Sequence, residues 1–299
     1  MGCLNPNQGF EHVFGNIHLS APYCNRSCPF CIGQFMMELD HYNTLDKWPM
    51  EGMDEFIEKC REQKVSEINL TGTNTEPLLF KHISELHQLL DNEIPDLKFG
   101  IRTNGVLVTK RLDDWALFDK GSVTICSLDD DIYKAMMGRG CPPDIAEIVR
   151  YSKHMPDLKV NIVLGPENTA NDDLDKTLRG LAEAGITRVN LREPYGQPHV
   201  GDPLVAAYEP EGQRLGMPYY TVYDMDCQYW DVHYCEVESV NLYASGRVSL
   251  LYPITEGYSP NGLVRSQDHF PGGRMQKQWL GSQAASEKAA LALRERLMD

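Results

Sequence analysis

Residues 23–31 read Tyr23-Cys24-Asn25-Arg26-Ser27-Cys28-Pro29-Phe30-Cys31, and they place three cysteines in one short loop after a strand-like segment. Thiolates are soft ligands that select zinc, copper(I) or iron–sulfur clusters. A structural zinc site usually takes four protein ligands, often in two Cys-x-x-Cys pairs, and the sequence holds no second pair. Three ligands from one loop instead fit a [4Fe–4S] cluster whose fourth iron stays open to a small molecule. The loop therefore predicts a reactive cluster site rather than a structural metal site.

Composition narrows the class of protein. The chain has 299 residues, of which 42% are hydrophobic, and a net charge of −15. That charge opposes tight binding of a phosphate backbone, so a large nucleic-acid substrate is disfavoured. No apolar run approaches the ~20 residues of a membrane span, and the N-terminus lacks the pattern of a signal peptide. Nine cysteines, an odd number, do not indicate a disulfide framework. We expect a cytoplasmic protein with no membrane partner.

Six segments are predicted to be strands, and they alternate with helical patterns. The predicted strands cover residues 12–20, 66–71, 97–103, 122–127, 158–164 and 187–192. Apolar residues recur at helical spacing at Leu79, Ile83, Leu86 and Leu90, and again at Leu174, Leu178 and Leu181. We expect the second helix to begin near Asn171 or Asp172 and to stop at Gly185. Alternating strands and helices predict a parallel sheet covered by helices.

Within the strands, polar and apolar residues alternate. The polar set comprises Asn16, His18, Ser20, Asn69, Thr71, Arg102, Asn104, Asn161, Asn190 and Arg192. Because side chains alternate across a strand, these residues share one face. The pattern predicts a lumen that holds a polar ligand near the carboxyl ends of the strands, where barrel enzymes place their sites. A two-layer sheet with one solvated face is the alternative.

The spacing Cys-x3-Cys-x2-Cys, with an aromatic residue before the last cysteine, resembles the signature of the radical S-adenosylmethionine (radical SAM) superfamily. The resemblance covers roughly residues 12–195 and implies a partial (β/α)6 TIM-like barrel of the α/β class. It implies that Cys24, Cys28 and Cys31 bind a [4Fe–4S] cluster, with Phe30 near the adenine of S-adenosylmethionine. The open iron would take the cofactor, whose reductive cleavage yields a 5′-deoxyadenosyl radical.

Residues 70–79 look like the Gly-Gly-Glu-Pro stretch with which this family binds the amino group of S-adenosylmethionine. The sequence departs from that pattern, because it keeps only Gly72 of the glycine pair and inserts three residues before Glu76. The resemblance therefore assigns the amino group to Thr71, Thr73 or backbone carbonyls beside Gly72, with Glu76 as a further candidate. The alternative is a polar turn in which Pro77 starts a helix.

Further strand ends resemble cofactor-contact positions of the family. The resemblance assigns cofactor-binding roles to Asn104, Ser127, Asp129, Asn161, Gly165 and Arg192. Arg192 could pair with the cofactor carboxylate, since a guanidinium binds a carboxylate in a bidentate manner. Taken one at a time, such residues also serve as helix caps or turn residues. Cys126 is a candidate hydrogen-atom donor, or alternatively a core residue.

The alternation stops near residue 196. We expect a core over residues 1–196, with strands from about residue 12, and a C-terminal β-hairpin/helix extension over 197–299 that closes the barrel and shapes the pocket. Its predicted elements are a strand at 219–223, a hairpin formed by 235–242 and 247–252, and a helix at 286–298. Cys227 and Cys235 are too few for an auxiliary cluster. The polar candidates here for contact with substrate are His199, Asp202, His233 and His269.

The sequence thus predicts a radical SAM enzyme that takes a hydrogen atom from a small-molecule, nucleotide or peptide substrate. Reduced flavodoxin or ferredoxin is the expected electron donor. Three alternatives stay open. They are a glycyl-radical activase, a non-catalytic metal protein that binds zinc with a distant ligand such as His41, and an electron carrier with the same cluster.

Overall fold

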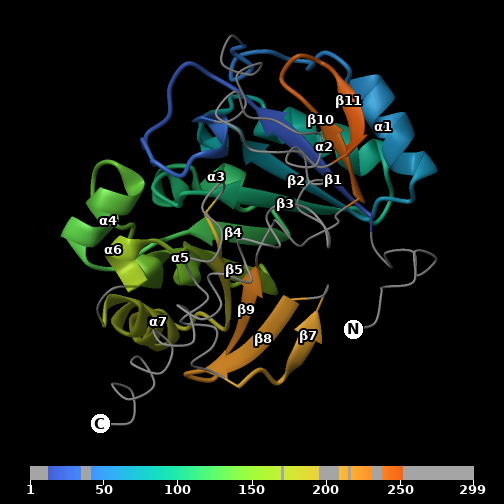
Figure 1. Ribbon diagram of the computed structural model, residues 1–299. Coiled ribbons are helices and arrows are strands. Elements are labelled where there is room, and N and C mark those ends of the chain that lie inside the picture. Colours follow the sequence, from blue (N-terminus) through green and yellow to red (C-terminus); the bar gives the residue numbers. More distant parts are fainter. Residues whose placement is uncertain are drawn as a thin grey trace, which may run out of the picture.

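A computed structural model describes residues 13–34, 42–169, 172–194, 209–214, 217–230 and 238–251. Its described strands form one 11-stranded sheet in the order β11-β10-β1-β2-β3-β4-β5-β6-β9-β8-β7 (Figure 1). The outermost strands, β11 and β7, are not paired with each other, so the described sheet is open. None of the helices in the described ranges has the length and apolarity that a membrane crossing requires.

Six parallel strands in chain order make the centre of the sheet, as the sequence predicts. They are β1 (Phe14–Leu19), β2 (Glu67–Gly72), β3 (Lys98–Thr103), β4 (Lys120–Thr124), β5 (Asp157–Val163) and β6 (Arg188–Arg192). The main deviation is β4, which ends at Thr124 rather than at Ser127. The chain leaves the sheet early because the Ser127 hydroxyl donates to Asp173 Oδ1 at 2.8 Å and holds a turn there.

Helices join these strands. They are α1 (Met53–Glu62), α2 (Ile83–Glu93), α3 (Leu112–Trp115), α4 (Asp130–Met137), α5 (Ile145–Tyr151), α6 (Pro166–Thr169) and α7 (Asp173–Glu183), with short 3-10 turns η1 (Ile32–Gln34), η3 (Pro77–Leu79) and η4 (Val108–Lys110). The prediction for α7 is confirmed, since Asp172 occupies the N-cap position and Gly185 follows with φ +93°. The helix predicted from Leu79 begins later, at Ile83, because Pro77 starts a separate turn.

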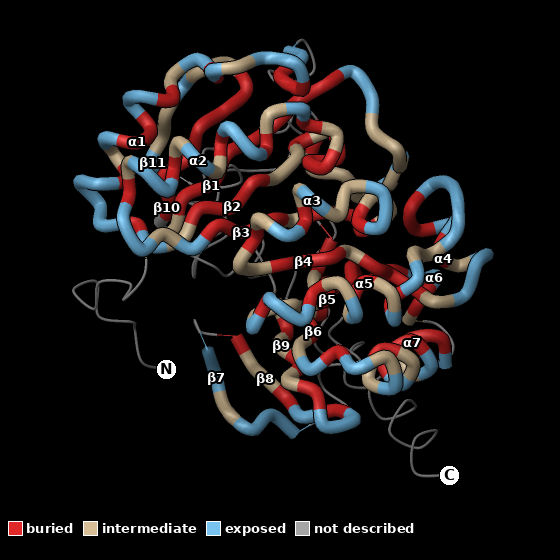
Figure 2. Tube along the Cα trace, turned by 180° about the vertical axis from the view of Figure 1, so that it is seen from behind, coloured by how far each residue is buried: buried red, intermediate tan, exposed pale blue. Residues whose placement is uncertain are grey.

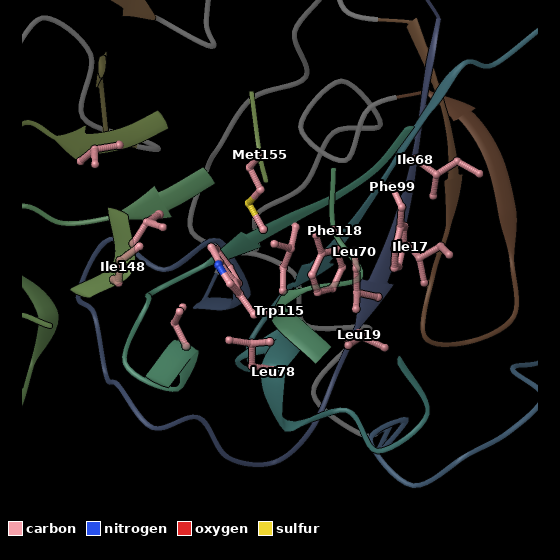
Figure 3. Packing of buried hydrophobic residues seen from close by; sticks show 14 of the residues in the cluster. Ile17, Leu19, Ile68, Leu70, Leu78, Phe99, Trp115, Phe118, Ile148 and Met155 are labelled. Carbon is pink, nitrogen blue, oxygen red and sulfur yellow. The ribbon is translucent and has the colours of Figure 1, made fainter. Parts of the chain in front are cut away.

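The core lies between the sheet and the helices. Apolar side chains of β1 and β2, such as Ile17, Leu19 and Leu70, are fully buried there (Figure 3). The rings of Phe99 and Phe118 stack with their centroids 4.7 Å apart. Full burial of each such side chain contributes about 1.5–3 kcal/mol to stability. Seen from behind, the strands are largely buried, and the helices carry exposed residues on their outer turns (Figure 2).

The C-terminal part of the chain lengthens the sheet at both edges. β9 (Met225–Trp230) pairs with β6 in parallel and continues antiparallel into β8 (Met217–Val222) and β7 (Gly212–Arg214). At the other edge, β10 (Glu238–Leu242) pairs with β1 in parallel and forms the predicted hairpin with β11 (Val248–Leu251). The structure thus confirms β8 and the hairpin.

Two C-terminal strands were not predicted. β7 lies within a segment, 196–216, that the sequence indicates as a loop, because Gly212 and nearby prolines break its pattern. β9 alternates buried and half-buried residues along its length, which is a strand signal in the sequence. The predicted helix at 286–298 lies outside the described residues, and the division into core and extension stays a prediction.

Candidate active site

A cavity of about 670 Å³ opens at the carboxyl ends of β1 to β6. Small-molecule sites commonly have volumes of this order, between ~300 and ~1,000 Å³. Its wall combines the cysteine loop, the loop after β2 and polar residues at the strand ends. The strand-end residues are His18, Thr71, Arg102, Thr124, Asn161 and Arg192. The predicted polar lumen is therefore present, and it meets the cysteine loop at one site.

The three cysteines of the loop are half-buried in the wall of this cavity. Cys31 Sγ lies 3.4 Å from the carbonyl oxygen of Thr73, and Cys28 Sγ lies 3.8 Å from that of Met137. Burial raises the pKa of the Cys24 thiol to about 11 and that of Cys28 to about 12. The described cysteines form no disulfide.

The arrangement of these thiols suits a cluster. In the described ranges no three metal-ligating side chains converge as ligands of a single ion do. A cubane cluster does not require such convergence, because each cysteine binds a different iron atom. Three half-buried thiols on one loop, facing an open cavity, fit the three corners of a [4Fe–4S] cluster.

Helix α4 and the turn after it hold the cysteine loop in place. Arg139 Nη2 donates to the carbonyl oxygens of Cys24 and Arg26. The backbone N–H of Ser27 donates to Met137 O at 3.2 Å, and Arg26 Nε donates to the hydroxyl of Tyr133 at 3.1 Å. Sequence reasoning missed these residues. The only local signal was the Gly138-Arg139-Gly140 run, in which both glycines have positive φ.

The loop after β2 forms another wall of the cavity. A Cβ at Gly72 would lie 1.7 Å from Thr75 O, so only glycine fits this turn. The side-chain oxygen of Thr73 is buried without a hydrogen-bond partner in the described structure, although Thr73 lines the cavity. Buried polar atoms are nearly always hydrogen-bonded in native proteins. This unsatisfied hydroxyl therefore fits a ligand that brings a polar group.

Glu76 is 1% exposed and is fully engaged by the protein. Its carboxylate accepts hydrogen bonds from Leu78 N at 3.1 Å, Thr103 Oγ1 at 2.5 Å and Asn104 N at 2.9 Å. Burial raises the pKa of this carboxyl group above its usual range. Glu76 thus caps the turn that Pro77 starts and joins the ends of β2 and β3. The polar turn of the alternative interpretation is present, and the cap residue also lines the cavity, while the cofactor role of this stretch stays a prediction.

Three further residues that are predicted to contact the cofactor, Phe30, Asn104 and Asn161, line the cavity. Asn104 Nδ2 donates to Asn25 Oδ1 at 2.6 Å, so the end of β3 contacts the cysteine loop directly. Asn161 Nδ2 donates to Ser122 Oγ at 2.6 Å. Phe30 is half-buried in the cavity wall and also packs on a small cluster that contains Met137 and Val163.

Four predicted residues do not line the cavity. Ser127 and Asp129 shape the turn into α4, because Asp129 accepts from the N–H groups of Asp131 and Ile132. Gly165 lies in the turn before α6. Cys126 is fully buried, with its Sγ 3.7 Å from Met137 Sδ, and burial raises its pKa. For these residues the structure shows the cap, turn and core roles that the sequence left as alternatives.

Cys227 is also buried in the core. The remaining candidates, His41, His199, Asp202, His233, Cys235 and His269, lie outside the described residues.

Comparison with known proteins identifies the family. The model of the radical SAM superfamily matches residues 19–181, which is more than half of the chain. The chain belongs to the radical SAM superfamily. Enzymes of this superfamily use a [4Fe–4S] cluster and S-adenosylmethionine. The chain spans less than half the length of the curated relative that it matches.

Two relatives put the match in context. The radical SAM chain is 25% identical over 125 residues to the FeMo cofactor biosynthesis protein NifB of Methanocaldococcus infernus, a match that covers 40% of this chain and 41% of NifB. The crystal structure of SuiB from Streptococcus suis superimposes with a TM-score of 0.57 at 12% identity, over 82% of this chain and 61% of SuiB. SuiB has also been crystallised with S-adenosylmethionine. At this identity, the likeness to SuiB establishes the fold alone.

Proposed function

We propose that Cys24, Cys28 and Cys31 bind the [4Fe–4S] cluster and that the adjoining cavity binds S-adenosylmethionine beside it. The observation that carries the proposal is that all three thiols lie in the wall of one polar cavity at the strand ends. When bound, the cluster and cofactor together supply a 5′-deoxyadenosyl radical that removes a hydrogen atom from a substrate C–H bond, while the protein supplies binding and orientation.

The residues of the cavity have distinct tasks in this proposal. The buried Thr73 hydroxyl and the backbone around Gly72 accept hydrogen bonds from the cofactor ammonium group, because the hydroxyl has no other partner in the described structure. Arg192 binds the cofactor carboxylate, and Phe30 and Asn161 lie against the adenine. Glu76 and Asn104 position the loops rather than the cofactor, since protein donors already occupy the Glu76 oxygens.

The substrate in this proposal is a small molecule, a nucleotide or a peptide. The net charge of −15 disfavours a large nucleic acid. Reduced flavodoxin or ferredoxin supplies the electron. We place the protein in the cytoplasm, because a thiolate-bound cluster requires cysteines that stay reduced.

The test is an anaerobic assay of cofactor cleavage. Reconstituted protein is mixed with dithionite and S-adenosylmethionine, and 5′-deoxyadenosine is measured by mass spectrometry. We expect product from the native chain and none from Cys28→Ala. Cys141→Ser is the matched control, because Cys141 is an exposed cysteine outside the loop. A native protein that binds zinc but no iron and yields no 5′-deoxyadenosine would refute the proposal.

A further inference from the structure

Charged residues on the lumen side of the sheet form a ladder near the amino ends of the strands. Lys120 Nζ lies 2.5 Å from Glu67 Oε2 and 3.1 Å from Asp157 Oδ2. Arg188 pairs with the same Asp157 and lies 3.8 Å from Asp226 Oδ2. Every carboxylate of this ladder is therefore paired with at least one cation.

Two other cations, Arg102 and Lys159, are outside this ladder. In the part of the chain that the structure describes, neither forms an ion pair or a hydrogen bond, but the charge of Lys159 interacts at longer range with Asp157 and Glu67. The guanidinium of Arg102 lies 5.8 Å from the ring centroid of Phe14. Arg102 lines the cavity. Lys159 is two residues before Asn161, another lining residue, so both side chains project from the same face of β5.

The strand register places these two cations at one level of the lumen. Arg102 of β3 pairs with Ser122 of β4, and Ser122 pairs with Lys159 of β5. Adjacent strands lie about 4.8 Å apart, so the two backbones are about 10 Å apart, and both long side chains can reach one small group. Ser122, whose hydroxyl accepts a hydrogen bond from Asn161 Nδ2, lies between them in the strand register.

Holding the positive charges of Arg102 and Lys159 close together in the lumen costs free energy. Burial is the main cause that lowers the pKa of Lys159 to about 8; the positive charges of Arg102 and Arg188 contribute, and the carboxylates of Asp157 and Glu67 partly offset them. Both side chains are half-buried, and partial burial of a cation costs free energy that a bound anion would offset. His18, on the same level, does not repel a cation or bind an anion strongly, since burial lowers its pKa to about 4 and leaves it neutral near pH 7.

The carboxylates of the cavity wall are already engaged. Glu76 accepts three protein hydrogen bonds, and Glu193 Oε1 accepts one from the hydroxyl of Tyr229 at 2.6 Å. Both belong to loops beyond the strand ends. They are thus at the rim of the lumen, above the level of Arg102 and Lys159.

We propose that Arg102, in the wall of the cavity, and Lys159, at the same level of the lumen, form an anion subsite that binds a carboxylate or phosphate group of the substrate. The inference rests on the proposed function, in which Arg192 binds the carboxylate of S-adenosylmethionine. Val163 pairs with Arg192, and Lys159 precedes Val163 by four residues, which is about 13 Å along a strand. The two anion-binding positions are therefore at different depths, and the substrate is held beneath the cofactor.

The test measures anion binding directly by isothermal titration calorimetry. Reconstituted protein is first saturated with S-adenosylmethionine, so that the probe does not compete for the cofactor contacts. It is then titrated with inorganic phosphate in one arm and acetate in the other. We expect the native protein to bind one of them. We expect Arg102→Gln and Lys159→Gln each to weaken that binding about tenfold or more, since a charge-assisted hydrogen bond is lost.

Two controls keep the result interpretable. Arg150→Gln removes an exposed cation that pairs with Glu147 on α5, so it should leave anion binding unchanged. Arg102→Lys keeps the charge and should bind the anion more tightly than Arg102→Gln, which separates loss of charge from loss of folding.

The outcomes distinguish this proposal from the proposed function. The tighter probe identifies the substrate group as a phosphate or a carboxylate. Native protein that binds neither probe, or binding that persists in both Gln variants, overturns the subsite. Anion binding without formation of 5′-deoxyadenosine supports the subsite and refutes the proposed function, whereas 5′-deoxyadenosine formation without anion binding overturns the subsite alone.

Discussion

Gly72 shows how a single position decides the shape of the loop after β2. We expect Gly72→Ala to abolish binding of S-adenosylmethionine, because the new Cβ would lie 1.7 Å from Thr75 O and the loop must move. The measurement is calorimetric titration with the cofactor, with circular dichroism to confirm the fold. Gly180→Ala is the control, since its Cβ would meet only the flexible end of Leu128, at 2.6 Å. Equal cofactor affinity in both variants would contradict the prediction.

The buried imidazole of His18 is expected to make the stability of the protein depend on pH. Burial lowers its pKa from 6.5 to about 4, so the unfolded chain takes up a proton before the folded chain does. Its contribution to stability is complete above pH 6.5 and is lost as the pH falls towards 4, by about 3 kcal/mol in all. We expect the Tm of the native protein to fall more between pH 7.5 and 5.0 than that of His18→Gln.

Comparing the native protein with His18→Gln isolates the titration of the His18 imidazole. Glutamine retains an N–H donor for Asn241 Oδ1, which His18 Nε2 contacts at 3.1 Å, but it does not titrate. The difference in Tm between the two pH values should be larger by a few degrees for the native protein. An equal loss of Tm in both proteins would show that His18 is not buried as a neutral group.

At the scale of single residues, the spacing of the cysteines predicted where they lie, but contacts between residues far apart in the sequence could not be predicted. The positions of Cys24, Cys28 and Cys31 in the cavity wall follow from a pattern that lies within eight residues. The hydrogen bonds from Arg139 to the cysteine loop cross 115 residues of sequence, and no local pattern encodes them. Ser127 and Asp129 resemble cofactor contacts in sequence because caps and binding residues use the same short polar side chains.

At the scale of elements, α4 and the turn after it act as a brace for the cysteine loop. We expect Arg139→Ala to lose the cluster to a chelator roughly fivefold faster, because two carbonyl oxygens of the loop lose their charged donor. Iron content and visible absorbance after reconstitution provide the measurement.

A matched substitution separates this effect from a general loss of charge. Arg150→Ala removes an exposed arginine whose partner, Glu147, is on its own helix. It should leave cluster retention unchanged. Equal rates of cluster loss in the two variants would mean that the turn after α4 does not hold the loop.

The strands of the central sheet could be predicted because their sequence signals are local, whereas the pairing of the edge strands depends on contacts between distant parts of the chain. The segments of β1 to β6 have a strong apolar face and alternate with helices, and both features are local. β10 lies beside β1, and β9 beside β6, because each fills an exposed edge of the assembled sheet. That choice depends on the finished sheet, so a pattern within β9 can indicate a strand but not its neighbour.

For the whole molecule, both edges of the six-stranded centre are completed by the last third of the chain. We expect Val240→Pro to lower the free energy of unfolding by about 3 kcal/mol or more, because β10 is an internal strand and proline removes a ladder hydrogen bond. Soluble yield and Tm are the measurements. Leu250→Pro, an exposed position on the outer strand β11, should cost much less. Similar losses at both positions would contradict this role of β10.

The charge of the whole molecule also differs from that of its lumen. The chain carries −15 overall, whereas the described strands place the cations Arg102 and Lys159 at one level of the lumen. The net charge indicated that a large nucleic-acid substrate is disfavoured. The lumen charges could not be predicted from it, because they depend on which face of β3 and β5 turns inward.

The pairing of β10 with β1 has a consequence for how a ribosome makes this protein. Asn16 of β1 and Asn241 of β10 are hydrogen-bonded partners 225 residues apart. At ~5–20 residues per second, the ribosome takes roughly 10 to 45 seconds to reach β10 after it has made β1. During that interval the nascent chain carries an open strand edge, which is a template for aggregation. The yield of the protein in a foreign host therefore depends on translation speed as well as on the stability of the finished fold.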